Sequence, residues 1–433
     1  MTAAPLRPHR QDGMIIDVCP TTVLAFLTIL CLLLVQWIGS MAAAGFLASG
    51  CLLVVRRPQT TLMELRRYWM IFAIAAWCLF TVLWSQYASL SLRYAIQLCV
   101  TFAIAVAIAS RLSPIIFLRI LFSAHLVAAL LSLAFGKVRG DGLGWLGIFG
   151  SKNAFSLPMS TLMLCAFAIM LDRNQSRTWR MLAAGGFLIG TFLLIQAQSA
   201  GQLLATGAAL AFALPFFLGR WLSFGQRILL AGFTVGLGIV VAILLVAMQE
   251  EVMALILETT GKDATLTGRT ELWSLAFREI AQQPFTGVGY QAYWVPGNPG
   301  AEAMWKEFGI SGKRGFHFHN TFISNAVEIG IIGVAMQAVA IFGALALATI
   351  WAFKEPRAES IFLTALMMRS TVLSMSEVVG FLQFDLATLM LVAALVYVLR
   401  NQRERRQQRM PLRQRSAVRP VNDAAEPAPP HPV

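Results

Sequence analysis

Arg269 lies where its side chain could bind a phosphate group. It precedes Thr270, which is predicted to cap an amphipathic helix over residues 271–283 lying on the membrane surface. A guanidinium group beside the free backbone N–H groups of a helix N-terminus is suited to phosphate binding. Two simpler interpretations remain open: Arg269 contacts lipid headgroups, or it pairs with a carboxylate on its own helix.

His319 lies where an imidazole could accept a proton. Asn320, which follows it, is predicted to cap an apolar helix that begins at Thr321. The positive end of that helix disfavours the imidazolium form, and a neutral histidine is a competent general base near pH 7. The alternative is that His319 only forms a hydrogen bond with a loop carbonyl.

The elements that position these residues are predicted to be membrane-spanning helices. The chain has 433 residues, is 58% hydrophobic and only 13% charged, and has a mean hydropathy of +0.69, which excludes an ordinary water-soluble globule. We therefore predict an all-α, polytopic membrane protein of about twelve spans. The spans are expected near residues 22–38, 39–55, 69–84, 95–111, 114–134, 155–171, 181–196, 201–218, 226–248, 320–351, 359–380 and 382–399.

Positive charge in the connecting segments predicts the orientation of the spans. Arginine and lysine recur on one side, at residues 7–10, 56–67, 111, 173–180, 220–227, 354–357 and 400–419. Because cytoplasmic loops are enriched in these residues, both termini are assigned to the cytoplasm. The predicted organisation is a cytoplasmic segment 1–21, spans over 22–248, a long periplasmic loop 249–319, spans over 320–399, and a basic, disordered tail 400–433. This topology explains the net charge of +13 better than nucleic-acid binding does.

Several motifs together resemble the O-antigen ligase and O-antigen polymerase superfamily. They are Gly-Arg-Thr-Glu-Leu-Trp (268–273), Pro-Phe-Thr-Gly-Val-Gly-Tyr (284–290), His-Asn (319–320) and Glu-Ile-Gly-Ile-Ile-Gly (328–333). Trp84-Ser85, Ser91-Leu92-Arg93 and Ser199 also look like that family. The segment Gly-Ile-Phe-Gly-Ser-Lys-Asn (147–153) resembles its exopolysaccharide-polymerase branch. The resemblance covers roughly residues 80 to 380.

The resemblance implies an inner-membrane glycosyltransferase of the GT-C-like type whose active site faces the periplasm. The donor would be a glycan on an undecaprenyl-diphosphate carrier, and the acceptor a sugar hydroxyl on lipid A core in ligases or on another carrier-linked repeat in polymerases. Both alternatives stay open, although the 147–153 motif favours a polymerase. Other polysaccharide-assembly proteins are possible partners.

The candidate site residues follow from this resemblance and from the chemistry of transfer. A diphosphate leaving group needs positive donors, and the acceptor hydroxyl needs a base. Arg269 and Arg139, with Arg93 and Lys152, are expected to bind the diphosphate, and His319, rather than His317, is expected to be the base. Supporting roles at this site are expected for Asn320, Glu377 and Ser199.

No cofactor or metal is expected. The sequence has no Asp-x-Asp pair that would clamp a divalent ion, so metal-independent inversion is predicted, with arginine side chains in the place of the metal. No cysteine lies in the long outer loop, and none has a partner at metal-ligand spacing.

Arg369 and Glu377 are charged residues inside one predicted span, 359–380, where charge is costly. Glu377 is expected to orient an arginine or the acceptor, or else to form a structural ion pair with Arg369. A multi-span transporter or flippase of lipid-linked glycans or small solutes is the alternative class of function, although the two halves of the chain show no clear internal repeat.

Overall fold

The computed structural model describes residues 19–140, 142, 144–230, 232–233, 269–313 and 315–409. Helices make up most of this part of the chain. They are α1 Pro20–Ile38, α2 Ser40–Val55, α3 Pro58–Arg67, α4 Ala73–Phe80, α5 Ala88–Arg111, α6 Pro114–Phe135, α7 Lys152–Leu171, α8 Arg177–Gln196, α9 Ala200–Leu218, α12 Arg269–Gln282, α13 Pro299–Glu307, α14 Thr321–Lys354, α15 Ala358–Ser374 and α16 Leu386–Arg409. Short 3-10 turns occupy Trp69–Phe72, Thr81–Leu83 and Gly219–Trp221, and strands β1 Lys137–Val138 and β2 Trp145–Gly147 form one antiparallel hairpin.

Local sequence explains where several helices begin. Ser113, Ser151 and Ser176 each accept a hydrogen bond from the backbone of the first turn that follows, at the start of α6, α7 and α8. Pro20 and Pro58 stand in the first turn of α1 and α3, where the missing N–H is not needed. Within each helix the backbone satisfies its own polar groups, which a hydrocarbon environment requires.

The described residues confirm an all-α, polytopic membrane fold. Seven helices are long and apolar enough to cross a membrane, and the number is eight if α2 and α3, which meet at a 95° bend, form one broken span. The predicted span 69–84 is a shorter apolar helical segment, and most of the predicted span 226–248 lies outside the described residues. The total of twelve spans therefore stays a prediction. At the other end, α16 continues to Arg409, so residues 400–409 of the predicted disordered tail are helical.

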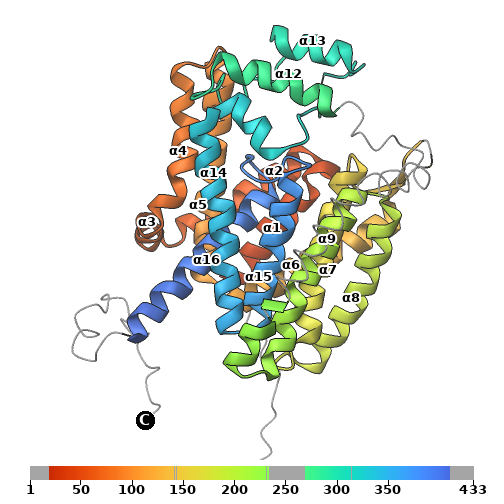
Figure 1. The fold of residues 1–433 in the computed structure, drawn as a ribbon, viewed down its shortest axis with the longest axis vertical. Helices are drawn as coiled ribbons and strands as arrows, with labels where there is room; N and C mark the ends of the chain where they lie inside the picture. The colour runs from red at the N-terminus through yellow and green to blue at the C-terminus, as the bar shows by residue number, and fades with distance from the viewer. Residues whose placement is uncertain are drawn as a thin grey trace, which may run out of the picture.

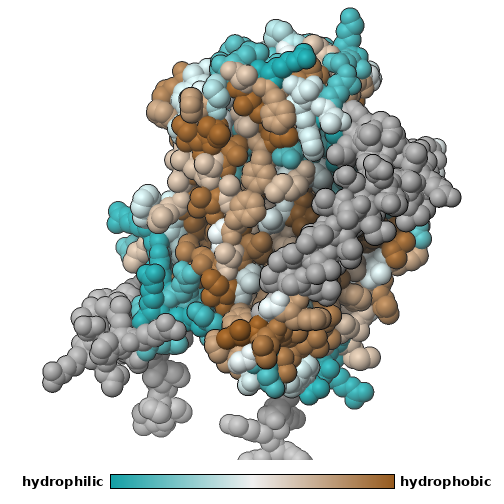
Figure 2. Space-filling model, in the orientation of Figure 1, coloured by the Kyte–Doolittle hydropathy of each residue, from teal (hydrophilic) through white to brown (hydrophobic). Residues whose placement is uncertain are grey.

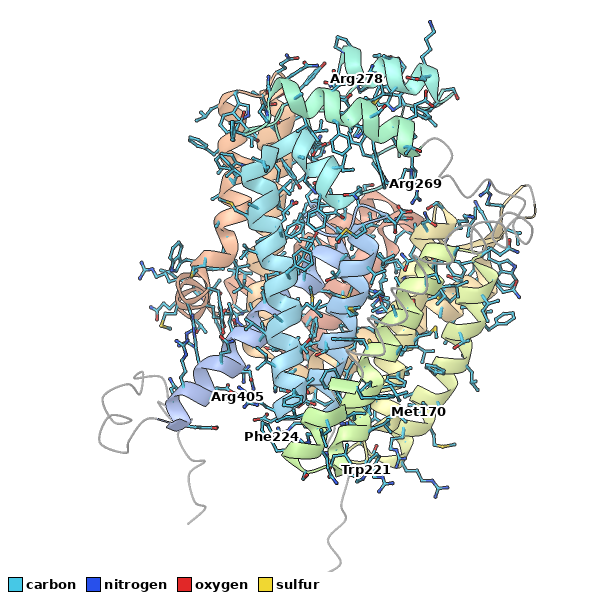
Figure 3. The ribbon with its side chains drawn as sticks, in the orientation of Figure 1. Met170, Trp221, Phe224, Arg269, Arg278 and Arg405 are labelled. Carbon is cyan, nitrogen blue, oxygen red and sulfur yellow. The ribbon has the colours of Figure 1, made fainter. Side chains whose placement is uncertain are left out.

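The long helices stand side by side, and α12 and α13 lie across one end of them, opposite the end of α16 (Figure 1). The hydrophobic core is built mainly from α5, α6, α7, α15 and α16. Within it α15 packs against α9 and α14, while α16 packs against α5 and α14. This arrangement places the loop between α15 and α16 at the end of the bundle that α12 covers, where Arg269 lies (Figure 3).

Helix α12 is the predicted amphipathic helix, and its apolar side packs against protein. Leu272 and Ala276 are buried in a hydrophobic cluster with Tyr293, Trp305 and Phe318. The periodicity of the sequence correctly predicted the apolar face, and the expected position of the helix on the membrane surface stays a prediction. Residues 284–318 fold back under the helix and supply the apolar partner.

Candidate functional site

Glu377 lies in a loop and not in the span predicted to contain it. Helix α15 ends at Ser374, and residues 375–385 connect it to α16. The start of α14 holds this loop in place, because Thr321 donates its hydroxyl to the Glu377 carbonyl at 2.8 Å and accepts the Val379 N–H at 3.0 Å. The Glu377 carboxylate is thereby brought to the end of the helix bundle that α12 covers.

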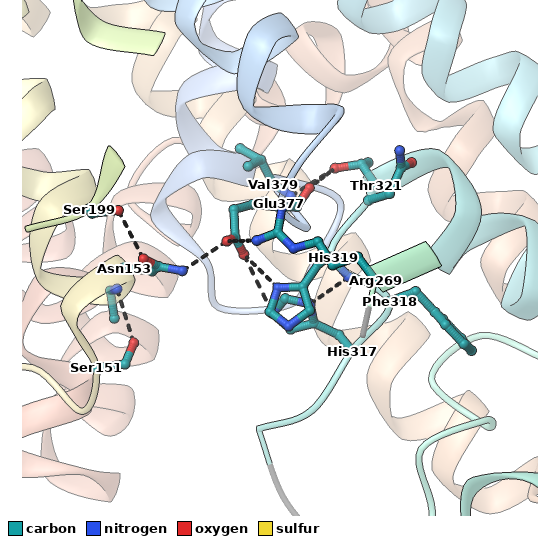
Figure 4. A network of polar contacts seen from close by, with 12 residues as sticks. Ser151, Asn153, Ser199, Arg269, His317, Phe318, His319, Thr321, Glu377 and Val379 are labelled. Atoms are coloured by element: carbon teal, nitrogen blue, oxygen red, sulfur yellow. Dashed lines mark hydrogen bonds and ion pairs between the residues drawn. The ribbon is translucent and has the colours of Figure 1, made fainter. Parts of the chain in front are cut away.

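Four polar side chains surround the Glu377 carboxylate, and we call these five residues the Glu377 cluster (Figure 4). Oxygen Oε1 accepts from Asn153 Nδ2 at 2.8 Å and lies 3.5 Å from Arg269 Nη2. Oxygen Oε2 lies 3.4 Å from His319 Nδ1 and 3.9 Å from His317 Nε2. The carboxylate therefore joins the loop 375–385 to α7, α12 and the segment before α14.

The position of His319 is fixed by the start of α14. The predicted N-cap is confirmed, because the Asn320 side chain accepts from the backbone N–H groups of Phe322 at 2.9 Å and Ile323 at 3.0 Å. The Asn320 amide also donates to the Met375 carbonyl at 3.1 Å. His319 itself has φ 51°, a left-handed conformation that residues other than glycine adopt at a cost and that concentrates at functional sites. The Nδ1 atom faces Glu377, which leaves Nε2 as the ring nitrogen for a substrate.

His317 is held neutral beside His319. Its Nδ1 accepts the backbone N–H of His319 at 3.1 Å, so its ring proton belongs on Nε2, which faces Glu377. Burial, the neighbouring His319 and Arg269 lower the pKa of His317 to about 4, although the Glu377 carboxylate opposes that shift. No role was predicted for His317, and its contact with the His319 backbone shows that it helps to hold the strained turn.

The Glu377 carboxyl is ionised at neutral pH. Burial by itself raises its pKa, but the hydrogen bond with His319 and the favourable electrostatic interactions with His319, His317 and Arg269 outweigh burial and hold the pKa below its usual range. Its side chain is only 15% exposed, so these partners replace most of its water. An ionised carboxylate at Nδ1 of His319 fixes the orientation and the tautomer of the ring.

Arg269 begins the described part of α12, so Thr270 lies inside the helix and is not its cap. The helix is anchored by Trp273, whose Nε1 donates to the Phe318 carbonyl at 2.7 Å. Glu377 is the partner described for the Arg269 guanidinium, which is 28% exposed. Because a guanidinium has five N–H donors, most of them remain available for an anionic ligand.

Asn153 connects the Glu377 cluster to α7 and α9. Its side chain donates to Glu377 and accepts the Ser199 hydroxyl at 2.9 Å, so the predicted supporting residue Ser199 lies one contact away from the carboxylate. Lys152 points elsewhere and donates to the Gln198 carbonyl at 3.3 Å. Sequence reasoning chose Lys152 for its charge and overlooked Asn153. The Ser151 cap at the start of α7 is the signal that indicates where Asn153 must sit.

Arg93 and Arg139 occupy other places. Arg93 is an exposed residue of α5, and its guanidinium lies 5.8 Å from the centre of the Tyr94 ring. Arg139 is exposed in the hairpin of β1 and β2, where its backbone N–H donates to the Gly144 carbonyl at 3.1 Å. The contacts described for the Glu377 cluster involve neither residue, so their roles stay predictions.

The glycine-rich segment 284–290 packs against a kink in α14. Gly330 interrupts the helical conformation of α14, and there the Ile331 N–H donates to the Pro284 carbonyl at 2.8 Å. A Cβ atom on Gly287 would lie 2.5 Å from the Glu328 backbone, and one on Gly289 would lie 2.4 Å from the Ser85 hydroxyl oxygen. Both glycines are thus needed for the close approach that sets the base of the outer loop.

A metal ion could also be held by part of the Glu377 cluster. One ligand atom from each of His317, His319 and Glu377 lies within 4.8 Å of the others. Two imidazoles and a carboxylate form a donor set that Zn²⁺ accepts. Arg269 and Asn153 engage the other carboxylate oxygen, however, so a positive charge already stands beside Glu377. The geometry permits either chemistry, and the difference can be measured.

Comparisons with known proteins agree with the motifs. Residues 184–338 match the family model for O-antigen ligase. The chain is 36% identical over 274 residues to "Exopolysaccharide production protein ExoQ" of Rhizobium meliloti (strain 1021). That match covers 62% of this chain and 62% of the relative, so the chain spans less than two thirds of that relative's length.

One solved structure is similar at a low level. It is described as "Structural coordination of polymerization and crosslinking by a peptidoglycan synthase complex", and the match has 16% identity and a TM-score of 0.40 over 78% of this chain and 98% of that chain. At this level the likeness does not indicate a shared fold. The family match over residues 184–338 and the rhizobial relative, together with the motifs around segment 284–290 and His319, show that this chain is similar to O-antigen ligases and to a protein of exopolysaccharide production.

Proposed function

We propose that the protein transfers a glycan from an undecaprenyl-diphosphate carrier to a sugar hydroxyl on the periplasmic face of the inner membrane. The observation that carries the proposal is the contact of His319 with Glu377, at 3.4 Å, beside the Arg269 guanidinium. A base with an orienting carboxylate and a cation with free donors are the groups that displacement of a sugar diphosphate needs.

His319 is the proposed general base. Glu377 accepts from Nδ1, so Nε2 can take the proton of the acceptor hydroxyl as its oxygen attacks the anomeric carbon of the donor. The new bond joins that oxygen to the carbon, and the bond from the carbon to the diphosphate oxygen breaks. One displacement of this kind inverts the configuration of the sugar.

Arg269 is the proposed ligand of the leaving diphosphate, which departs with the bonding electrons. Its donors not used by Glu377 can stabilise the charge that develops on the phosphate oxygen. Lys152, beside Asn153 at the start of α7, is a proposed second cation. Arg139 and Arg93 remain candidates for the diphosphate once the donor is bound.

The proposed reaction needs no metal ion. Arg269 supplies at Glu377 the positive charge that a divalent ion would otherwise bring. Purified protein should therefore keep its transfer activity after exhaustive chelation, and added Zn²⁺ should inhibit if it enters between His317, His319 and Glu377. Loss of activity on chelation, with recovery on adding back one ion, would assign the cluster to a metal instead.

Polymerase activity is favoured over ligase activity. The 36% identical relative is named as a protein of exopolysaccharide production, and the 147–153 motif resembles the exopolysaccharide-polymerase branch. The proposed topology has twelve spans and cytoplasmic termini, with residues 249–319 in the periplasm. Contacts with other polysaccharide-assembly proteins are part of the same proposal.

Polysaccharide from a deletion strain tests the function directly. Carrier-linked single repeats without long chains would identify a polymerase, and long chains left on the carrier without transfer to lipid A core would identify a ligase. Complementation with wild-type protein should restore the product, and His319→Ala should not. Normal glycans in the deletion strain would refute both activities, and transport of lipid-linked glycans would become the better explanation.

A further inference from the structure

An apolar groove lies at the end of the bundle farthest from the Glu377 cluster. It has a volume of about 470 Å³ between the C-terminal ends of α9 and α14, and its walls include Phe212, Phe216, Ile350 and Phe353. Ile350 is 47% exposed, so the groove opens at the surface of the bundle. A cleft of this size and lining is suited to an acyl chain.

A second, polar pocket adjoins the groove at Lys354. It has a volume of about 170 Å³ and is lined by Lys354, Gln402, Arg405 and Arg406. Lys354, the last residue of α14, lines both pockets. Figure 2 shows hydrophobic surface beside hydrophilic surface at this end of the bundle, and Figure 3 places Arg405 near the lower end of α14.

The polar pocket carries excess positive charge. Arg405 is paired with Glu355 at 2.9 Å, which neutralises one of its three cations. The side chains of Lys354 and Arg406 have no hydrogen bond or ion pair within the part of the chain that the structure describes. The nearby Glu404 is engaged by Arg400 at 2.9 Å. Two cations therefore remain for a ligand of opposite charge.

We propose that this double pocket binds an anionic phospholipid. Its phosphate would lie between Lys354 and Arg406, and one acyl chain would occupy the groove between α9 and α14. Basic pockets at the ends of membrane helices bind anionic headgroups in this way, and the long side chain of Lys354 can reach from the apolar groove to the phosphate. The site is separate from the proposed transfer reaction and would tie the position of α14 and α16 to the lipid leaflet.

Native mass spectrometry of the full-length protein in detergent tests the proposal, with phosphatidylglycerol as the anionic probe and phosphatidylcholine as the zwitterionic one. Lys354→Gln with Arg406→Gln should weaken phosphatidylglycerol binding roughly ten- to thirty-fold, because each cation near a headgroup contributes about tenfold or less. The matched control is Arg56→Gln with Arg66→Gln, which removes the same charge from exposed residues of the α2–α3 bend and should change little.

A second variant tests the apolar half without changing charge. Ile350→Trp places an indole in the open side of the groove and should weaken binding about tenfold by excluding the acyl chain. The proposal is overturned if the control pair weakens binding as much as the pocket pair, if phosphatidylcholine binds as tightly as phosphatidylglycerol, or if Ile350→Trp leaves binding unchanged. The last result would mean that the groove holds no lipid chain.

Discussion

Arg369 and Glu377 are eight positions apart in sequence, and the structure gives them opposite surroundings. Arg369 is 1% exposed inside the bundle, where its Nη1 donates to Thr161 at 2.7 Å and to Ser160 at 3.2 Å. No carboxylate of the described residues pairs with it. Glu377 instead meets one arginine, two histidines and an asparagine.

The different surroundings of Arg369 and Glu377 indicate which of the two charged residues belongs to the candidate site. Arg369 is surrounded by neutral groups that satisfy some of its donors, while its Nε atom has no partner in the described part of the chain. Glu377 organises residues from separate helices around a strained histidine at the edge of the bundle. A buried charge alone therefore does not identify a functional site. Several complementary polar groups that converge on one charged residue do identify it.

The largest expected effect is at His319. His319→Ala should lower the transfer rate by about 10²–10⁴-fold, because it removes the proposed base. The rate is measured on purified protein with a carrier-linked donor, and the thermal unfolding temperature should change little because the side chain is partly exposed. Near-normal transfer by a folded His319→Ala protein would remove His319 from the mechanism.

The second largest loss of transfer rate is expected on substitution of Arg269. Arg269→Ala should lower transfer by about 10²–10³-fold through loss of charge stabilisation at the leaving group. Arg278 on the same helix is an exposed arginine and a matched control, and Arg278→Ala should keep near-normal transfer (Figure 3). Equal losses in the two variants would mean that α12 needs positive charge in general and that Arg269 has no specific contact.

Substitutions of Asn153 and Lys152, at the start of α7, test which of these neighbouring residues contributes to transfer. Asn153→Asp keeps the shape but places a second carboxylate 2.8 Å from Glu377, so transfer should fall roughly 10–100-fold as like charges disturb the partner of His319. Lys152→Gln should have a smaller effect. The reverse order, measured in the same assay, would restore Lys152 as the residue that acts at this position.

The lowered pKa of His317 leads us to expect that the stability of the protein depends on pH. The pKa of His317 is about 4 in the folded protein, against 6.5 for an unperturbed histidine. Between these values the unfolded state binds more protons, so stability falls as pH falls from about 6.5 to 4. His317→Gln should remove this part of the decrease, as measured by thermal unfolding in detergent at several pH values. An unchanged profile would show that His317 is not held neutral by the fold.

The smallest effect is expected at Arg369. Arg369→Met replaces a buried, unpaired charge by an apolar chain, and Ser160 keeps a hydroxyl partner in Thr206 at 2.6 Å. Stability should be unchanged or higher by up to about 1–4 kcal/mol, with transfer near the wild-type rate. Loss of transfer in a stable Arg369→Met protein would break the contrast with Glu377 and give Arg369 a functional role.

Local sequence signals predicted local structure well. Hydropathy indicated most of the described long helices, and Asn320 was correctly predicted as the cap of α14 because a cap depends on only a few neighbouring residues. Periodicity likewise indicated α12 and its apolar face. These features are set by interactions within about one helical turn.

Errors arose where distant segments meet. The stretch after Ser374 is apolar enough to extend a predicted span, but the contact of Thr321 with Glu377 and Val379 pulls it into a loop. No role was predicted for Asn153, because its partner Glu377 lies 224 positions away in the sequence. The protein partner of the apolar face of α12 was not predicted either, since amphipathicity shows that one face is covered and does not show by what.

The sequence by itself determined that this chain is a bundle of apolar helices. It also determined that the candidate catalytic residues, Arg269 and His319, lie in the polar segment between two groups of these helices. Hydrophobic burial and capping act over short distances and can be read from neighbouring residues. Only the tertiary structure decided that Glu377 is the residue on which Arg269, His317, His319 and Asn153 converge. That convergence depends on how α7, α12, α14 and the loop 375–385 pack together, because a charge is stabilised by whichever groups the fold brings within a few ångströms.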